Sequence, residues 1–261
     1  MADDPVLYEQ RGPVALITLN RPDRLNAWNA SLERRYFELL DQCATDRSVR
    51  SIVVTGAGRG FCAGADMDVL QGIGNENADG MSRGARYQQW HTTEIPKPVI
   101  AAINGACAGI GLCQALLCDI RFAAAGAKFT TAFARRGLVA EHSISWTLPR
   151  LVGPAKALDL LMSGRTFLAE EAERAGLVNE VVPGDQLLDH AVAYAHELAT
   201  FSSPASMAMM KKQVWADLEK GLRAATEAAS ALMLESFTRP DFKEGVQSFL
   251  EKRVPDFPSY P

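Results

Sequence analysis

Two glycine-containing loops in the sequence can present backbone amides to a substrate oxygen. Residues 56–66 follow the apolar run 52–55, and residues 104–111 follow the apolar run 98–103. Glycine permits close backbone approach, and the first amides of a helix have no partner within that helix. Loops that follow adjacent parallel strands lie side by side at the carboxyl ends of those strands. We therefore expect one amide from each loop to bind a single oxygen that gains negative charge, as in an oxyanion hole.

Other interpretations of these loops are limited by their spacing. Neither loop has the G-x-x-x-x-G-K-[ST] pattern of a phosphate loop or the G-x-G-x-x-G pattern of a dinucleotide site. The alternative that remains is structural, in which residues 104–119 form a tight turn before a core helix without a ligand. Residues 72–84 are polar and glycine-rich, and we predict a mobile loop there that covers a pocket.

Composition excludes several classes of function. The chain has 261 residues, of which 48% are hydrophobic, and a formal net charge of −4 with acidic and basic residues mixed. Nucleic-acid binding needs a concentrated basic patch, so we predict no nucleic-acid partner. The acidic N-terminus lacks the apolar core of a signal peptide, and no apolar run approaches membrane-spanning length. We predict a cytoplasmic protein without a membrane partner.

The cysteines indicate neither a disulfide framework nor a metal site. Their number is odd, their surroundings are apolar, and their spacing does not match paired metal ligands. The five are Cys43, Cys62, Cys107, Cys113 and Cys118. We expect them to be reduced and mostly buried, and we expect no bound metal.

The elements that must position the two loops alternate between strand and helix. Apolar runs between turn signals predict short strands at residues 14–19, 52–55, 98–103, 120–123, 128–130 and 178–182. Asn29 is placed to cap a helix whose apolar residues Leu32, Tyr36, Leu39, Leu40 and Cys43 share one face. This alternation predicts an α/β core over residues 1–185.

After residue 186 the pattern is only helical. The predicted helices span 187–199, 204–222, 224–237 and 241–252, and they form a helical module over residues 186–261. Apolar residues recur there at helical spacing, at Met207, Met209, Met210, Leu232, Met233, Leu234 and Phe237. They pack either on the core of their own chain or in an oligomer interface, and the sequence leaves both open.

Four motifs together resemble the enoyl-CoA hydratase/isomerase (crotonase) family. Residues 20–29 read N-R-P-D-R-L-N-A-W-N, which is similar to the family's opening N-R-P-x-x-x-N-A-x-N. Residues 61–66 match F-x-A-G-x-D, and residues 98–105, with the glycine turn 109–111, match P-V-I-A-A-x-N-G and its glycine-rich turn. Residues 172–178 resemble A-x-x-x-G-L-V. The motifs occur in the family's order and cover nearly the whole chain.

The resemblance implies a fold and a substrate. The fold is α/β, a crotonase-like ββα spiral core with a C-terminal helical trimerisation module, assembled as a homotrimer or hexamer. The substrate and partner is an acyl-CoA thioester, and no separate cofactor is implied because coenzyme A is part of the substrate. By position, the oxyanion hole is the backbone N–H of Ala65 and of Ile110.

Positions that bind coenzyme A also carry over from the resemblance. Arg24, Leu25 and Ala63 match positions that contact the nucleotide. Phe249 and Lys252 match C-terminal positions that contact coenzyme A, in some relatives from a neighbouring subunit. Asp66, by contrast, we interpret as a structural cap for the short helix that follows it.

The sequence departs from the family's hydratases at two catalytic positions. Those enzymes resemble one another in using two glutamates, whose positions are occupied here by Cys113 and Phe133. Glu141 instead falls where several family isomerases carry a single Glu or Asp. A solvated loop glutamate is the alternative interpretation. Phe133 and Trp146, with Leu138 and Ile110, are predicted to line an apolar substrate pocket around this carboxylate.

One carboxylate is sufficient for double-bond migration. Glu141 can move a proton between C2 and C4 of an enoyl-CoA, while the oxyanion hole holds the dienolate. We predict this isomerase reaction. Hydration or thioester hydrolysis with a non-standard acid/base, and CoA-ester binding without turnover, remain alternatives. Two further residues are secondary candidates. His142 is either a second proton carrier or a surface residue. Cys113 is either a nucleophile or weak acid, or a buried residue that only packs.

Overall fold

Two β-sheets of different size form the core of the fold. The computed structural model describes residues 4–72 and 87–260, so the predicted loop at 72–84 lies almost wholly outside the described residues. The larger sheet is parallel except for its first pair of strands. Its strands in sheet order are β1 (Val6–Arg11), β2 (Val14–Leu19), β3 (Ser51–Gly56), β5 (Val99–Ile103), β7 (Ile120–Ala124) and β10 (Glu180–Val182).

The smaller sheet continues from the ends of the larger one. Its order is β4 (Gly60–Cys62), β6 (Ala106–Ala108), β8 (Lys128–Thr130) and β9 (Phe167–Leu168). Strands β3 and β5 are parallel neighbours in which Ile52 pairs with Val99, and the strands that follow them, β4 and β6, also pair in parallel. The two predicted glycine loops therefore leave the same edge of the large sheet side by side.

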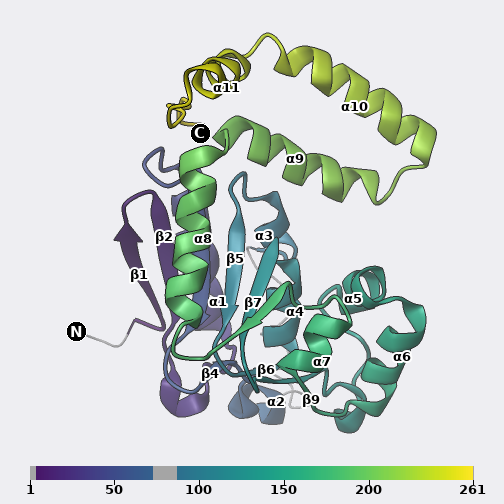
Figure 1. The fold of residues 1–261 in the computed structure, drawn as a ribbon. Helices are drawn as coiled ribbons and strands as arrows, with labels where there is room; N and C mark the ends of the chain where they lie inside the picture. The colour runs from purple at the N-terminus through teal and green to yellow at the C-terminus, as the bar shows by residue number, and fades with distance from the viewer. Residues whose placement is uncertain (1–3, 73–86, 261) are drawn as a thin grey trace.

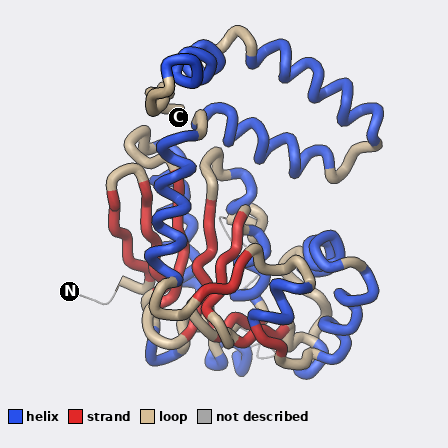
Figure 2. Tube along the Cα trace, viewed as in Figure 1, coloured by secondary structure: helices blue, strands red, loops and turns tan. Residues whose placement is uncertain are grey.

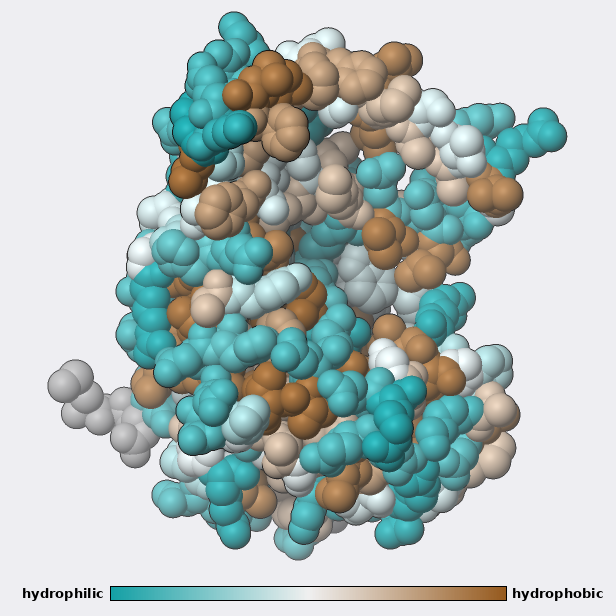
Figure 3. Space-filling model, in the orientation of Figure 1, coloured by the Kyte–Doolittle hydropathy of each residue, from teal (hydrophilic) through white to brown (hydrophobic). Residues whose placement is uncertain are grey.

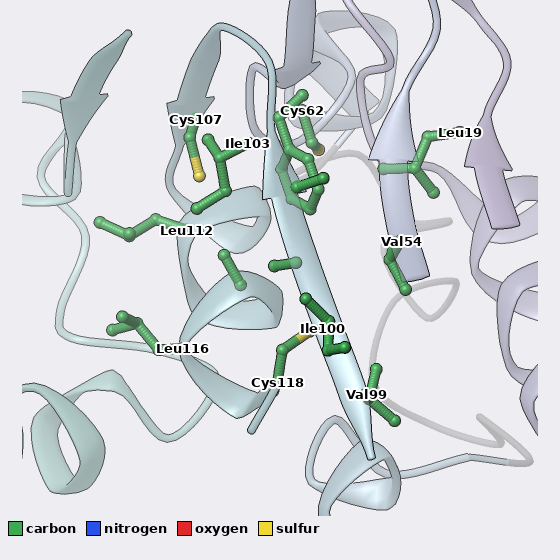
Figure 4. Close-up of a cluster of buried hydrophobic side chains, with 14 of the residues drawn as sticks. Leu19, Val54, Cys62, Val99, Ile100, Ile103, Cys107, Leu112, Leu116 and Cys118 are labelled. Atoms are coloured by element: carbon green, nitrogen blue, oxygen red, sulfur yellow. The ribbon is translucent and has the colours of Figure 1, made fainter. Parts of the chain in front are cut away.

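Strand β5 lies at the centre of the hydrophobic core. All five of its residues are buried, as expected for a parallel strand covered on both faces. Figure 4 shows the side chains of Ile100 and Ile103 on this strand, with Leu112 and Leu116 of the neighbouring helix beside it. That helix, α4 (Ile110–Leu117), is itself buried at every residue. The segment that carries the predicted oxyanion residue Ile110 is thus held by packing along its whole length.

Helix α1 (Ala30–Thr45) confirms the predicted cap and apolar face. The side chain of Asn29 accepts a hydrogen bond from the Leu32 amide at 3.0 Å, which satisfies one of the unpaired donors of the first turn. The predicted face is buried at Leu32, Tyr36, Leu39, Leu40 and Cys43. Burying such a stripe is what fixes an amphipathic helix on a sheet.

The remaining helices of the core connect or cover the two sheets. They are η1 (Pro22–Arg24), α2 (Met67–Gly72), α3 (His91–Glu94), η3 (Ala134–Arg136), α5 (Ile144–Val152), α6 (Pro154–Ser163) and α7 (Ala169–Arg174). Gly176, just beyond α7, has φ of +77°, a left-handed conformation that glycine adopts without strain. Helix α7 therefore ends just before this glycine.

Helix α8 (Leu187–Phe201) packs on the large sheet. Its buried face is Leu187, Ala191, Ala195 and Ala199. The hydroxyl of Ser51 in β3 donates to the carbonyl oxygen of Ala195 at 3.0 Å. The first helix of the predicted module 186–261 therefore forms part of the core layer, while the domain boundary at residue 185 stays a prediction.

The last three helices extend away from this core (Figures 1 and 2). They are α9 (Pro204–Asp217), α10 (Leu222–Ser236) and α11 (Pro240–Glu251). Met210, Met233, Leu234 and Phe237 each expose half or more of their surface, so their own chain leaves much of this apolar surface uncovered. A buried ion pair holds the start of this extension, because Lys211 Nζ lies 2.8 Å from Asp119 Oδ2.

Candidate active site

The two glycine loops pack backbone against backbone. Gly64 and Gly109 have φ of +107° and +50°. A Cβ added to Gly109 would lie 3.8 Å from the Gly64 Cα, and one added to Gly64 would lie 3.3 Å from the Ala108 carbonyl oxygen. Only glycine combines these dihedral angles with this approach, so the loops are fixed next to each other.

The amide of Ala65 is turned away from its neighbouring segment. Ala65 forms a parallel bridge with Trp28, in which the Trp28 amide donates to the Gly64 oxygen at 2.8 Å. The Asp66 amide donates to the Trp28 oxygen at 2.9 Å. In a strand, the residue between two such bonded residues points its own N–H to the opposite side. Within the described ranges, no backbone bond uses the Ala65 amide as donor.

The amide of Ile110 is also unpaired. Ile110 is the first residue of α4, and the first bond of the helix runs from the Cys113 amide to the Gly109 oxygen at 3.0 Å. Amides in this first turn carry the positive end of the helix dipole. Among residues 4–72 and 87–260, no backbone bond is donated by the Ile110 amide. The two predicted oxyanion donors are therefore available and lie on loops that touch.

Asp66 holds the first of these loops in shape. Its Oδ1 accepts from the Asp68 amide at 3.2 Å, and its Oδ2 lies 2.7 Å from an Arg21 guanidinium nitrogen. The hydrogen bond from Arg21 lowers the pKa of the Asp66 carboxyl, since it stabilises the ionised form. The prediction that Asp66 caps α2 is confirmed.

Glu141 lies on a strained loop that contacts α4. The Cys113 thiol lies 3.8 Å from the main-chain oxygen of Glu141. The next two residues, His142 and Ser143, have φ of +51° and +67°, a region that non-glycine residues rarely occupy and that often marks functional loops. The Glu141 side chain is 37% exposed. It is neither buried in the core nor fully solvated.

His142 accompanies this carboxylate. Its Nε2 lies 3.6 Å from Glu141 Oε2, and its side chain is 21% exposed. Burial lowers the pKa of His142 because it disfavours the charged imidazolium, and the charges of Glu141 and Glu33 oppose that shift in part. The loop therefore brings a neutral imidazole next to the predicted base.

The two positions matched to hydratase glutamates carry no acid. Burial raises the pKa of the Cys113 thiol strongly, and the nearby charge of Glu141 raises it further. A thiol in this state is a poor nucleophile. Phe133 is 6% exposed and belongs to the hydrophobic core. This geometry favours a packing role for Cys113.

Trp146 faces a different part of the molecule from the one predicted. Its ring stacks on Trp215 of α9 with centroids 5.9 Å apart, and the Arg150 guanidinium lies 3.8 Å from its centroid. These residues line an apolar cavity of about 500 Å³ between α4, α5 and α9. Figure 3 shows hydrophobic residues around the hollow between the tail helices and the core. The described ring contacts of Trp146 are with Trp215 of α9 and with Arg150 of its own helix.

The predicted coenzyme A contacts fall into two separate groups. Leu25, with φ of +50°, accepts a hydrogen bond from the Ala63 amide at 3.0 Å, and the neighbouring Arg24 lies 3.6 Å from Asp68. This first group adjoins the Ala65 loop. Phe249 of α11 is 83% exposed, and Lys252 caps that helix in a left-handed conformation. Helix α11 lies at the opposite end of the chain from β4 and α2 (Figure 1).

Sequence reasoning missed a polar cluster beside the site. Gln114 is 3% exposed within the otherwise apolar helix α4, and its Nε2 donates to Gln89 Oε1. Gln89 and Trp28 both bond to Glu33 Oε2, at 2.9 and 2.8 Å. The available signal was a glutamine among apolar helix residues, since a buried amide needs partners.

Two other kinds of site were searched for in the described part of the chain. Among those residues, no group of three or more His, Cys, Asp or Glu side chains is placed to hold a metal ion. No helix among them is long and apolar enough to cross a membrane.

Comparison with known proteins agrees with this geometry. Residues 9–259 match the sequence model of a family described as enoyl-CoA hydratase/isomerase. A protein of Rhizobium meliloti named as a probable enoyl-CoA hydratase is 39% identical, over 98% of this chain and 99% of its own. This chain belongs to the enoyl-CoA hydratase/isomerase family. It is an enzyme of acyl-CoA esters, and its predicted crotonase-like α/β fold is confirmed.

Solved structures of the family include both named activities. An enoyl-CoA hydratase from Mycobacterium marinum is 53% identical with a TM-score of 0.71, over 83% of this chain and 100% of that one. A monofunctional enoyl-CoA isomerase from M. smegmatis is 37% identical with a TM-score of 0.72, over 85% and 98%. Similarity to the family therefore does not choose between hydration and isomerisation.

Proposed function

We propose that this family member is an enoyl-CoA isomerase with Glu141 as its only carboxylate base. The observation that carries the proposal is that loop 141–143 contacts α4 at Cys113, one turn beyond the unpaired Ile110 amide. The thioester oxygen binds the amides of Ala65 and Ile110. Glu141 then acts on the acyl carbons next to that group.

The proposed reaction moves one proton and one double bond. Glu141 takes a proton from C2 of a 3-enoyl-CoA, and the electrons of that C–H bond form a dienolate whose charge lies on the thioester oxygen. The two amides stabilise this charge, and loss of one such donor costs about 10²–10³ in rate in other enzymes. Glu141 returns the proton at C4, which leaves a 2-enoyl-CoA and the original carboxylate. No water or second acid is consumed.

A homotrimer or hexamer is part of the proposal. Phe249 on α11 and Lys252 at the end of that helix belong to the opposite end of the molecule from β4 and α2, so they reach the same coenzyme A only if α11 packs on a neighbouring chain. The exposed apolar residues of α9–α11 support such an interface, because large exposed apolar surfaces mark association sites. In this proposal residues 186–261 form the oligomerisation module, and α8 anchors it to the core.

Hydration is the second candidate, and His142 favours it. A neutral imidazole 3.6 Å from Glu141 could supply the second proton carrier that Cys113 and Phe133 cannot provide. In that case Glu141 would take a proton from water as the hydroxide adds at C3 of a 2-enoyl-CoA, and His142 would pass that proton from Glu141 to C2.

Conversion of trans-3-hexenoyl-CoA to 2-hexenoyl-CoA tests the proposal. We expect wild-type turnover, and we expect Glu141→Gln to reduce kcat by about 10³ or more while hexanoyl-CoA binding survives, since only the base is lost. Glu38→Gln on α1 is a matched control away from the site. Hydration of 2-hexenoyl-CoA without isomerisation would favour the second candidate. Unchanged isomerisation by Glu141→Gln would show that another group is the base.

A further inference from the structure

A chain of hydrogen bonds leads from an ionised carboxylate to a buried, unpaired oxygen. Glu33 Oε2 accepts from Trp28 Nε1 at 2.8 Å and from Gln89 Nε2 at 2.9 Å. Gln89 Oε1 accepts from Gln114 Nε2. Within residues 4–72 and 87–260, the Oε1 atom of the 3% exposed Gln114 is buried and has no hydrogen-bond partner.

The chemistry of Glu33 fixes the direction of this chain. An ionised carboxylate only accepts, so Gln89 must turn its NH₂ group toward Glu33 and its oxygen toward Gln114. Gln114 must then donate through its own NH₂ group. The group left over is necessarily a carbonyl oxygen, an acceptor that calls for a donor. A buried acceptor without a donor is unfavourable, and such groups in native proteins usually have a partner.

Gln114 is aligned with the oxyanion donor. Ile110 and Gln114 are separated by four residues on α4, so their side chains lie on the same face of the helix. Helical side chains lean toward the helix N-terminus, which directs Gln114 toward the turn of Ile110. Trp28 lies at the other end of the hydrogen-bond chain, and its backbone forms a parallel β-bridge with that of Ala65. The polar cluster therefore joins both loops that carry the proposed oxyanion donors.

Glu33 and Gln114 also adjoin the loop of the proposed base. The charge of Glu33 acts on His142, and Cys113, the residue before Gln114, contacts Glu141. A purely hydrocarbon acyl chain would leave the oxygen of Gln114 unpaired in this region. A hydroxyl group could donate to it.

We propose that the acyl group of the substrate carries a hydroxyl beyond C3, which donates a hydrogen bond to Gln114 Oε1. This inference rests on the proposed binding of an acyl-CoA at the Ala65 and Ile110 amides. Gln114, held by Gln89 and Glu33, is then a specificity residue for oxygenated acyl chains. The pantetheine amides are common to all CoA esters and play no part in this selection.

Binding of saturated esters tests the proposal without turnover. The probes are hexanoyl-CoA and its 4-, 5- and 6-hydroxy derivatives, measured by isothermal titration calorimetry. We expect at least one hydroxy ester to bind wild-type protein about tenfold more tightly than hexanoyl-CoA, since it pairs a buried acceptor. Gln114→Met, which keeps the length of the side chain, is expected to abolish that gain and to keep hexanoyl-CoA binding. Gln114→Leu gives a second variant if the first does not fold.

Gln88→Met is the matched control, because Gln88 is exposed and neighbours the same cluster. It should retain the full hydroxyl preference. The proposal is overturned if no hydroxy ester binds wild-type protein more tightly than hexanoyl-CoA, as expected if water fills the position. It is also overturned if Gln114→Met or Gln114→Leu keeps the preference. Isomerase activity without a hydroxyl preference would overturn this inference alone, whereas failure of hexanoyl-CoA to bind would overturn the proposed function as well.

Discussion

The Cys113 thiol lies 3.8 Å from the main-chain oxygen of Glu141, so the helix that begins at Ile110 directly contacts the loop of the proposed base. The resemblance to family hydratases matches the position of Cys113 to a glutamate. Here a small apolar side chain supports the backbone of a different acid. The contact fixes the backbone of Glu141 against α4.

Cys113→Ser tests whether this cysteine only supports the loop. The hydroxyl can keep the contact with the Glu141 oxygen, so we expect kcat for 3-hexenoyl-CoA to stay within about threefold of wild type, a barrier change of roughly 0.7 kcal/mol. Cys43→Ser, also at a fully buried cysteine, controls for the effect of burying a hydroxyl. A loss of two or more orders of magnitude specific to Cys113→Ser would instead assign the thiol a chemical role.

Lys211→Met is expected to destabilise the attachment of the tail helices. Lys211 Nζ lies 2.8 Å from Asp119 Oδ2, and the two side chains are 8% and 20% exposed. Removing one partner of a buried pair leaves an uncompensated charge, and such changes cost about 3–5 kcal/mol. We expect the free energy of unfolding to fall by about 3 kcal/mol, the lower end of that range. Asp119 keeps its hydrogen bond from the Val99 amide, which limits the loss.

Urea unfolding at one fixed protein concentration measures this loss, since association also stabilises the folded state. Lys212→Met is the matched control, because Lys212 is the exposed neighbour on the same helix. Equal unfolding midpoints for the two variants would show that the ion pair does not hold α9 to the core.

The sequence predicted the elements whose apolar pattern is long enough to be distinctive. The strand at 98–103 and the face of α1 are examples, because each buries a continuous or periodic apolar set. Strand β1 was missed, since Glu9, Gln10 and Arg11 lie on an edge strand that is partly exposed and polar. Three-residue strands such as β4 and β6 depend on pairing between distant loops, and a local pattern does not encode that pairing.

The site could be predicted only where a backbone motif defines it. The family resemblance assigns Ala65 and Ile110 through the motifs of the two glycine loops, and their role stays a prediction. The cluster of Glu33, Gln89 and Gln114 could not be found this way, since its members come from α1, the turn before α3, and α4, which are distant parts of the chain. Trp146 shows the opposite case, because an apolar residue near Glu141 in sequence can turn its ring toward α9 instead.

His142 should make the folded protein more sensitive to acid. Burial holds its pKa below the ordinary value near 6.5, so as the pH falls below that value the unfolded chain takes up a proton before the folded chain does. The contribution of neutral His142 to the free energy of unfolding is therefore complete above about pH 6.5. It is lost as the pH falls from that value through the lower pKa of the folded protein. His142→Gln should reduce the difference in unfolding free energy between pH 7.5 and pH 5.5.

His196→Gln serves as the comparison, because His196 is exposed. This variant should keep the wild-type difference between the two pH values. A His142→Gln protein whose stability falls with acid as steeply as wild type would contradict the assigned burial of a neutral imidazole.

A crystal structure with a bound acyl-CoA tests the central claim most directly. Hexanoyl-CoA suits this measurement because it lacks the double bond that would be turned over. We predict that the thioester oxygen lies about 3 Å from the amide nitrogens of both Ala65 and Ile110, with Glu141 facing the acyl carbons. A thioester oxygen bound elsewhere, with either amide directed away from it, would contradict the account.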